Sequence, residues 1–387
     1  MLRYVASFAA IALALLRADG KLADPGKVGP LPVGVTTTVL IDYSRTDKFT
    51  NKARTLVTEI WYPATDDSRG LPKNRYTEFF PGGVTPAIDQ ILLKSHKKTA
   101  AEIEAGYWNE AVRDARVRAG KFPLIVFSHG NGGTRFQNTF WFDHMVSHGY
   151  IIVSADHTAN ARHTIIDGEL IPFQSSQRAN SAEDRVKDMS FLLDEMMRWN
   201  RGADSRLAGR IDTAAVGAAG MSFGSFTTVR VADADARFKA TIPMAGIGLD
   251  HTNLAIPTLP MLGAEDRTLG PRGNELIRAY YEKHQGSAFL LELINGGHYS
   301  FTDIFKINKN FGDGAGEGKR RDTGEPFRYT SMEDTYRVIN SYSAAFCGVF
   351  LKGEKGYLAF LRENHWPEML IWKTKGLHRD GADGAVR

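Results

Sequence analysis

The fold of this chain is decided by residues 214–232, which read AAVGAAGMSFGSFTTVRVA. The small apolar residues at 214–219 are typical of a buried strand, and Phe226–Ala232 is compatible with a helix. Between them lies a G-x-S-x-G sequence, Gly220-Met221-Ser222-Phe223-Gly224. Where a strand turns sharply into a helix, only glycine fits beside the turn, and the serine hydroxyl is pushed outward. We therefore expect a strand, a tight turn that presents Ser222, and a helix.

Short, wholly apolar runs recur on both sides of this stretch. Such runs, separated by segments of helical length, are typical of strands buried on both faces of a parallel sheet. The intervening segments fit amphipathic helices, for example Ala182–Arg198, and two earlier β-branched segments, Val35–Ile41 and Thr55–Tyr62, can pair as antiparallel strands. The sequence therefore predicts an α/β fold: a mostly parallel central sheet with antiparallel N-terminal strands and helices on both faces. The predicted parallel strands are Leu124–Phe127, Tyr150–Ser154, Ala214–Ala219, Ala240–Met244, Thr258–Leu262 and Ala288–Ile294.

We expect one large domain over residues 21–354, followed by a C-terminal extension over 355–387. Two segments are predicted to be insertions: Ala87–Ala119, which is more helical than extended, and Asp303–Thr330, a Gly-rich surface loop or lid. Ser331–Lys352 is predicted to be a helix with Ser331 as its cap and one apolar face. Cys347 lies near that face, and we expect a buried, inert thiol.

Composition excludes several classes of protein. The chain has 387 residues, of which 43% are hydrophobic and 24% charged, so it is not intrinsically disordered. The net charge is +4 with no basic block interleaved with aromatics, so we expect no nucleic-acid partner. The one dense basic cluster, Lys319-Arg320-Arg321, is expected to be a solvated loop. A single cysteine excludes an intrachain disulfide and a cysteine metal cluster.

Residues 1–20 have the pattern of a secretory signal peptide. Arg3 precedes an apolar run from Val5 to Leu16, and small residues suited to cleavage after Gly20 follow. The run has 12 residues, whereas a membrane span needs roughly 20. We therefore expect a secreted or periplasmic protein with no stable membrane insertion. The alternative is an N-terminal helix retained in a cytosolic protein.

Residues able to complete a nucleophilic site with Ser222 follow later strands. Glu265 and Asp266 lie at the carboxyl end of the predicted strand 257–263. We favour Asp266 as the acid, with Glu265 and Asp250 as alternatives and a helix cap as the non-catalytic interpretation. His298 follows the last apolar strand on a glycine turn, from which a general base can reach Ser222. The order serine, acid, histidine is typical of hydrolases built on this turn.

A glycine-rich loop, FSHGNGG at residues 127–133, ends another predicted strand. The backbone N–H groups of Asn131 and of Phe223, the residue after the serine, are expected to bind an oxyanion. His129 is expected to orient this loop by hydrogen bonding. Half or more of the aromatic residues at 136–142 are expected in a helix core. The residues expected to bind substrate are Phe136, Trp141 and Met221.

Eleven histidines raise the question of a metal. His144 and His148 have the i, i+4 spacing with which a helix can bind zinc, but no glutamate follows His144 as the zinc-protease sequence requires. Asp156 and His157 also follow a predicted strand, and we expect them to fix a loop. We therefore expect no metal and no cofactor.

At these residues the chain resembles the α/β-hydrolase superfamily, and within it platelet-activating-factor acetylhydrolase and related dienelactone-hydrolase-like bacterial serine esterases. The resemblance implies a serine hydrolase that needs no metal, with the two insertions framing the acyl pocket. Two departures matter: Met221 stands where histidine is frequent, and Ser222 stands where true dienelactone hydrolases carry cysteine, which disfavours that substrate. The resembling stretches are Ile60-Trp61-Tyr62-Pro63, residues 127–133, Ser147-His148-Gly149-Tyr150, residues 220–224 and residues 297–303.

Together these patterns predict a secreted serine carboxylic-ester hydrolase, esterase- or lipase-like, that forms an acyl-enzyme with a small-molecule or lipid ester. An amidase or peptidase with the same three residues is one alternative. A non-catalytic binding module on the same fold is another. Acyl chain length, the alcohol group and the oligomeric state stay open at this point.

Overall fold

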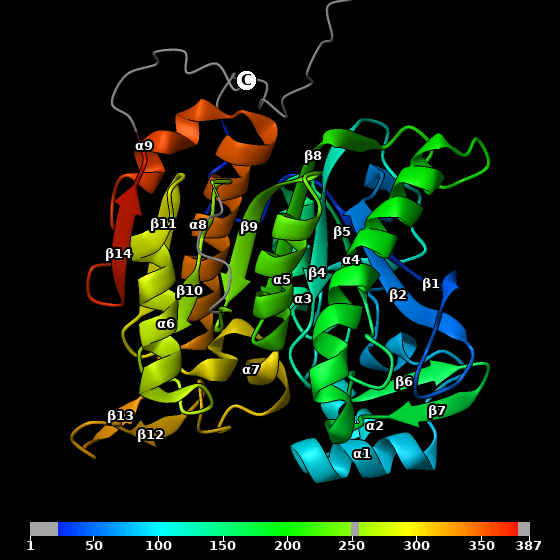
Figure 1. Cartoon of the computed structure of the whole chain (residues 1–387), viewed down its shortest axis with the longest axis horizontal. Helices are drawn as coiled ribbons and strands as arrows, with labels where there is room; N and C mark the ends of the chain where they lie inside the picture. Colours follow the sequence, from blue (N-terminus) through cyan, green and yellow to red (C-terminus); the bar gives the residue numbers. More distant parts are fainter. Residues whose placement is uncertain (1–21, 249–254, 378–387) are drawn as a thin grey trace, which may run out of the picture.

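A central sheet organises the computed structural model, which describes residues 22–248 and 255–377. Within these residues the sheet has ten strands, in the order β14-β11-β10-β9-β8-β4-β5-β2-β1-β3 (Figure 1). The six strands from β11 to β5 run parallel to one another, and β1 and β2 pair in antiparallel fashion. The predicted fold class is confirmed. The strand bounds are β1 Val33–Thr46, β2 Ala53–Pro63, β3 Ala111–Arg113, β4 Phe122–Ser128, β5 Ile151–Ala155, β8 Ile211–Met221, β9 Phe238–Met244, β10 Met261–Gly263, β11 Ala288–Leu293 and β14 Leu370–Lys375.

Helices cover both faces of this sheet, with α4, α5 and α6 on one face and α3 and α8 on the other (Figure 1). Strand β4 shows why its sequence is wholly apolar: Leu124 and Val126 enter the core under α4, whereas Ile125 and Phe127 enter the core under α3 and α8. The helix bounds are α1 Pro86–His96, α2 Ala100–Glu104, α3 Thr139–Ser147, α4 Arg178–Arg201, α5 Phe223–Ala234, α6 Gly270–Lys283, α7 Ile304–Ile307, α8 Met332–Lys352 and α9 Leu358–Leu361.

The predicted helix at 331–352 is α8. The hydroxyl of Ser331 accepts a hydrogen bond from the backbone N–H of Asp334 at 3.2 Å, so Ser331 caps the helix as expected. Cys347 is buried in the α8 core, and burial raises the pKa of its thiol well above the ordinary value. A thiol in this environment is inert at neutral pH.

The two predicted insertions contain more regular structure than their composition suggested. The first forms α1 and α2, but its second half supplies the edge strand β3, which pairs with β1. The second contains α7 and a hairpin of β12 (Glu317–Lys319) and β13 (Pro326–Arg328). A further hairpin, β6 (His163–Ile166) with β7 (Glu169–Pro172), follows β5. Figure 1 shows α1, α2, α7 and the two hairpins gathered at one end of the sheet.

The C-terminal segment also joins the domain. After α9, strand β14 pairs antiparallel with β11, from Ala288 opposite Lys375 to Leu293 opposite Leu370. Residues 370–375 thus extend the central sheet instead of lying outside it. The sequence signal was weak because an edge strand of six residues, with alternating burial, lacks the continuous apolar run of the inner strands.

The N-terminal segment is held against α3 by two histidines. The Nε2 atom of His144 lies 3.0 Å from the carbonyl oxygen of Pro25, and that of His148 lies 2.9 Å from the carbonyl of Lys27. This pair therefore anchors a loop, and the Nε2 atom of each ring faces a backbone oxygen. The predicted signal peptide, residues 1–20, lies outside the described residues. Across 22–248 and 255–377, no helix is both long and apolar enough to span a membrane.

Candidate active site

The turn from β8 into α5 carries Ser222 in a strained conformation. Its backbone has φ 56° and ψ −116°, a left-handed region that non-glycine residues seldom adopt. A Cβ on Gly224 would clash with the carbonyl oxygen of Ser128, and a Cβ on Gly220 would clash with the backbone of Gly224. Both glycines of the motif are thus required by close backbone approach. Strain of this kind is about 1–3 kcal/mol and is characteristic of functional sites.

Ser222 begins a continuous chain of hydrogen bonds. Its Oγ lies 2.9 Å from Nε2 of His298, and Nδ1 of the same ring lies 2.7 Å from Oδ2 of Asp266. Because an ionised carboxylate only accepts, Nδ1 of His298 carries the proton, and Nε2 is left to accept from the serine hydroxyl. Asp266 is fully buried and His298 is 2% exposed, whereas Ser222 is partly exposed. The arrangement can remove a proton from an accessible hydroxyl.

Of the two candidate acids among the described residues, Asp266 is the one that contacts His298. Its other oxygen accepts from the backbone N–H of Leu269 at 2.7 Å, which fixes the carboxylate plane. Glu265 points elsewhere and pairs with Arg320 at 3.1 Å. Asp250 lies outside the described residues.

The basic cluster at 319–321 is engaged with the loop that carries Asp266. Arg320 pairs with Glu265 and lies over the Phe327 ring at 4.4 Å. Arg321 donates to the backbone oxygen of Asp266 at 3.0 Å. The expectation of a purely solvated cluster is therefore wrong for these two arginines, because they fasten the β12–β13 hairpin to this loop.

The glycine-rich loop lies beside Ser222, and both Asn131 and Phe223 line the same cavity as the serine. The backbone N–H of Gly130 donates to Oε1 of Gln137 at 3.1 Å, and that of Gly133 donates to the carbonyl of Gly130 at 3.0 Å. These bonds fold the loop into a compact turn. The roles of the Asn131 and Phe223 amides as oxyanion donors stay a prediction.

A buried polar network supports this loop from beneath. Arg185 of α4 donates to the carbonyl oxygens of His129 at 2.5 Å and Gly130 at 3.1 Å, and its Nε donates to Oδ1 of Asn160 at 2.9 Å. Its guanidinium also lies over the Phe223 ring, 4.6 Å from the centroid. Arg185 thus contacts both the glycine-rich loop and Phe223, the residue that follows Ser222.

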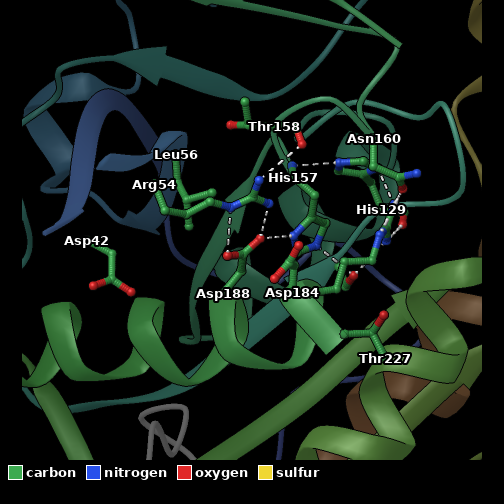
Figure 2. A network of polar contacts seen from close by, with 12 residues as sticks. Asp42, Arg54, Leu56, His129, His157, Thr158, Asn160, Asp184, Asp188 and Thr227 are labelled. Atoms are coloured by element: carbon green, nitrogen blue, oxygen red, sulfur yellow. Dashed lines mark hydrogen bonds and ion pairs between the residues drawn. The ribbon is translucent and has the colours of Figure 1, made fainter. Parts of the chain in front are cut away.

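The same network contains a second Ser–His–Asp chain. Figure 2 shows His157 beside Asp188, which also pairs with Arg54. The Nδ1 of His157 lies 2.9 Å from Asp188, and its Nε2 lies 2.8 Å from the hydroxyl of Ser128. All three residues are fully buried, and none lines the cavity at Ser222. Substrate therefore cannot reach Ser128, and this chain fixes the loop, as expected for His157.

A cavity of about 530 Å³ opens above Ser222 and His298. This size is typical of small-ligand sites. Both insertions contribute to its wall, as the resemblance implied: Ser95, His96 and Tyr107 come from the first, and Ile304, Ile307 and Phe311 come from the second.

Two of the three predicted substrate contacts, Phe136 and Met221, line this cavity. Trp141 does not, and that prediction is corrected: it is fully buried on α3, with its ring 6.0 Å from that of Phe127. Trp141 lies on the short helix α3, which packs between the sheet and α8, and its side chain belongs to the core on that face. Sequence reasoning missed Tyr76, His96 and Arg162, which approach the cavity from distant segments.

Comparison with known proteins places the chain among ester hydrolases by similarity. Residues 96–311, more than half of the chain, match the PET hydrolase-like family, and residues 17–169 match platelet-activating factor acetylhydrolase, isoform II. A platelet-activating factor acetylhydrolase of Cavia porcellus is 23% identical over 270 residues, 61% of this chain and 57% of that protein. Cutinase est1 of Thermobifida alba is 25% identical over 215 residues, 54% of this chain and 64% of that one.

This chain thus spans less than two thirds of the length of either curated relative. A solved structure covers more: a ferulic acid esterase from Streptomyces cinnamoneus superposes with a TM-score of 0.64 at 25% identity, over 84% of this chain and 91% of that one. Its fold agrees with the sheet described above. Sequence match and fold together show that this chain is an α/β-hydrolase and belongs to the PET hydrolase-like family.

Proposed function

We propose that this chain is a serine carboxylic-ester hydrolase in which Ser222 is the nucleophile. One observation carries the proposal: an unbroken hydrogen-bonded chain links the Ser222 hydroxyl to the buried Asp266 carboxylate at the wall of a cavity. The similar proteins are named as a cutinase, an acetylhydrolase and an esterase, and each name denotes hydrolysis of an ester. Their names support the choice of an ester over an amide.

In the first step, Nε2 of His298 takes the proton of Ser222 as its Oγ attacks the ester carbonyl carbon. The imidazole becomes a cation, and the Asp266 carboxylate at 2.7 Å stabilises that charge. His298 then gives the proton to the departing alcohol oxygen, and the acyl group stays on Ser222. A water molecule repeats the sequence and releases the acid.

The tetrahedral intermediate carries a negative oxygen that needs donors. Ser222 stands at the start of the 12-residue helix α5, so the amide of Phe223, the first residue of that helix, lies at the helix end that carries the partial positive charge. The Asn131 amide is the second donor in this proposal. Removing one such donor usually lowers kcat by about 100- to 1000-fold.

The strained backbone of Ser222 serves the same chemistry. A left-handed serine between a strand and a helix projects its Oγ away from both elements and toward His298. A serine in ordinary strand or helix geometry would lie along one element and lose this approach. The strain is therefore a positioning device held in place by the close contacts of Gly220 and Gly224.

The test is turnover of p-nitrophenyl esters of increasing acyl length, with p-nitroacetanilide as the matched amide. We expect ester hydrolysis, a fall of at least about 10⁴-fold in kcat for Ser222→Ala, and little amide turnover. Ser128→Ala is the matched control, because the Ser128 hydroxyl also faces a histidine that pairs with an aspartate, His157, but has no access to substrate. We expect it to retain activity within about 10-fold. Equal losses in the two variants would contradict the assignment, and faster amide than ester turnover would make the chain an amidase.

Secretion is also proposed, on the charged–apolar–small pattern of residues 1–20. Expression of the full chain in a bacterium should give a periplasmic or extracellular product. Its N-terminal sequence should begin at Lys21. A cytosolic product that retains residues 1–20 would contradict this part of the proposal.

A further inference from the structure

The wall of the cavity carries a cation that has no carboxylate partner among the described residues. Two residues with formal charge line it, Arg162 and Asp303. Asp303 is fully engaged: its carboxylate accepts from the backbone N–H groups of Thr139 at 2.9 Å and Phe140 at 3.0 Å, and Lys306 lies 3.5 Å away. No described carboxylate lies within 4.0 Å of the Arg162 guanidinium.

Buried arginines elsewhere in the described residues show two ways in which such a cation is accommodated. Arg54 pairs with Asp47 and Asp188, and Arg135 pairs with Asp156 and Glu59. A buried charge is normally compensated in this way, because leaving it alone in a site of low polarity is unfavourable. Arg185 is also fully buried and has no carboxylate within 4.0 Å among the described residues, but each of its three guanidinium nitrogens donates a hydrogen bond within the protein.

Arg162 uses only part of its guanidinium within the protein. Its Nε donates to the carbonyl oxygen of Gly132 at 3.2 Å, and Nη1 donates to Nε2 of His96. The third nitrogen, Nη2, has no hydrogen-bond partner among the described residues and is not one of the atoms that burial cuts off from solvent. Two nitrogens thus fix the group against the cavity wall, and one edge of the fork stays open.

A second donor lines the same cavity. Tyr76 is 3% exposed and lines the cavity, and its hydroxyl likewise has no partner and is not sealed from solvent. Burial raises the pKa of Tyr76 and the nearby Arg162 cation opposes that rise, so the phenol is a neutral donor at physiological pH. Burial and Arg162 lower the pKa of His96 to about 3, so His96 is a neutral acceptor and brings no further charge.

We propose that Arg162 and Tyr76 form a carboxylate-binding subsite, so that the substrate is an ester that also carries a free carboxylate, such as a half-ester of a dicarboxylic acid. The planar guanidinium and the phenol donate to carboxylate oxygens, while Ser222 attacks the ester group elsewhere in the same cavity. This inference rests on the proposed function of Ser222. It adds the charge of the substrate, which the relatives' names do not give.

The experiment compares monomethyl adipate with dimethyl adipate, which differ in one carboxylate. Wild type should show a kcat/KM at least about 10-fold higher for the half-ester, as expected for a charge-assisted contact. Arg162→Gln should lower kcat/KM for the half-ester about 10- to 100-fold more than it lowers kcat/KM for the diester, mainly through KM. Arg162→Lys should restore part of the preference, and Tyr76→Phe should reduce it. Arg116→Gln, the same charge change at an exposed ion pair, is the control.

Binding without turnover gives an independent readout. Adipate should bind Ser222→Ala in calorimetry, and the double variant with Arg162→Gln should bind at least about 10-fold more weakly. A 6-acetoxyhexanoate substrate places the carboxylate on the alcohol side of the ester, whereas monomethyl adipate places it on the acyl side, and the substrate whose turnover is more sensitive to Arg162→Gln shows the orientation.

The two proposals fail in different ways. If neither adipate ester is hydrolysed and no other ester is, the proposed function fails. If the diester is hydrolysed and Arg162→Gln lowers both esters equally, Arg162 only supports the Gly132 loop, and the subsite is refuted. A wild-type preference for the diester would refute it as well.

Discussion

Replacing Arg185 with methionine removes the cation that lies beneath the glycine-rich loop. Two acceptors then lose their only described donors, the carbonyl oxygen of His129 and Oδ1 of Asn160. Gly130 keeps the N–H of Gly133, and Asp188 keeps Arg54 and His157. The loss is thus confined to the loop and leaves no new unpaired carboxylate.

The magnitude follows from these two orphaned acceptors. Each buried acceptor without a donor is unfavourable by about 1–3 kcal/mol, so Arg185→Met should lower the free energy of unfolding by about 2–6 kcal/mol. The substitution also removes the unfavourable burial of the guanidinium charge, so we expect a loss of stability in the lower half of that range. A loop displaced by about 1 Å should reduce kcat about 100-fold and leave KM within about 3-fold, because the loop acts on the transition state.

The assay is urea unfolding together with ester turnover, each on folded protein at 25 °C. Arg198→Met is the matched control: it lies on the same helix α4, its side chain is 63% exposed and it pairs only with Glu195. The control should change the free energy of unfolding by less than about 0.5 kcal/mol. A destabilised Arg185→Met with unchanged kcat would refute the argument that this cation positions the loop.

Three further predictions concern the acid, the buried titrating groups and the turn. Asp266→Asn should lower kcat by about 10³–10⁴-fold in steady-state assays, because the amide does not stabilise the imidazolium. Burial raises the pKa of Asp143 to about 7. Between about pH 4 and 7 the folded state then binds a proton that the unfolded state has lost. Protonated Asp143 therefore contributes a share of about 4 kcal/mol to the free energy of unfolding, and this share is lost as the pH rises from about 4 to 7. Asp143→Asn should remove this share in unfolding titrations at several pH values. Burial lowers the pKa of several histidines, so the unfolded state binds protons that the folded state does not. The free energy of unfolding therefore falls as the pH falls from about 6.5 toward 4. These histidines are His96, His129, His144, His148, His157, His163 and His284. Gly224→Ala should prevent recovery of folded protein or lower its melting temperature by more than about 10 °C, because the new Cβ meets the Ser128 backbone.

Each of these has a result that would count against it. Full activity of Asp266→Asn would mean that the carboxylate charge is not needed. A stability difference between wild type and Asp143→Asn that is independent of pH would contradict the raised pKa of Asp143. Unchanged stability between pH 6.5 and 4 would contradict the buried neutral histidines, and a normally folded Gly224→Ala would show that the turn can relax.

The sequence predicted the sheet and the Ser222 site because both depend on local patterns. Inner parallel strands are buried on both faces, so their apolar runs are continuous and easily seen. The serine, acid and histidine each follow such a strand, and strand ends meet at one edge of the sheet. The distances among Ser222, Asp266 and His298 agree with that expectation.

The remaining features depend on contacts between distant segments. Arg162 meets His96 of α1, 66 positions earlier, and no local pattern indicates that pairing. Trp141 was misplaced because an aromatic after the glycine loop fits a cavity wall and a helix core equally well. Arg185 and Asp188 did leave a signal, since both fall on the buried stripe of α4 with Met189 and Leu192. Charged residues on such a stripe predict a buried network.

The central claim is that Ser222 is the nucleophile. The most direct measurement is mass spectrometry of the folded full chain after reaction with a fluorophosphonate, with the adduct located by peptide sequencing. The claim predicts one adduct per chain, on Ser222, retained in Ser128→Ala and abolished in Ser222→Ala. An unmodified wild type, or an adduct on any other residue, would contradict it.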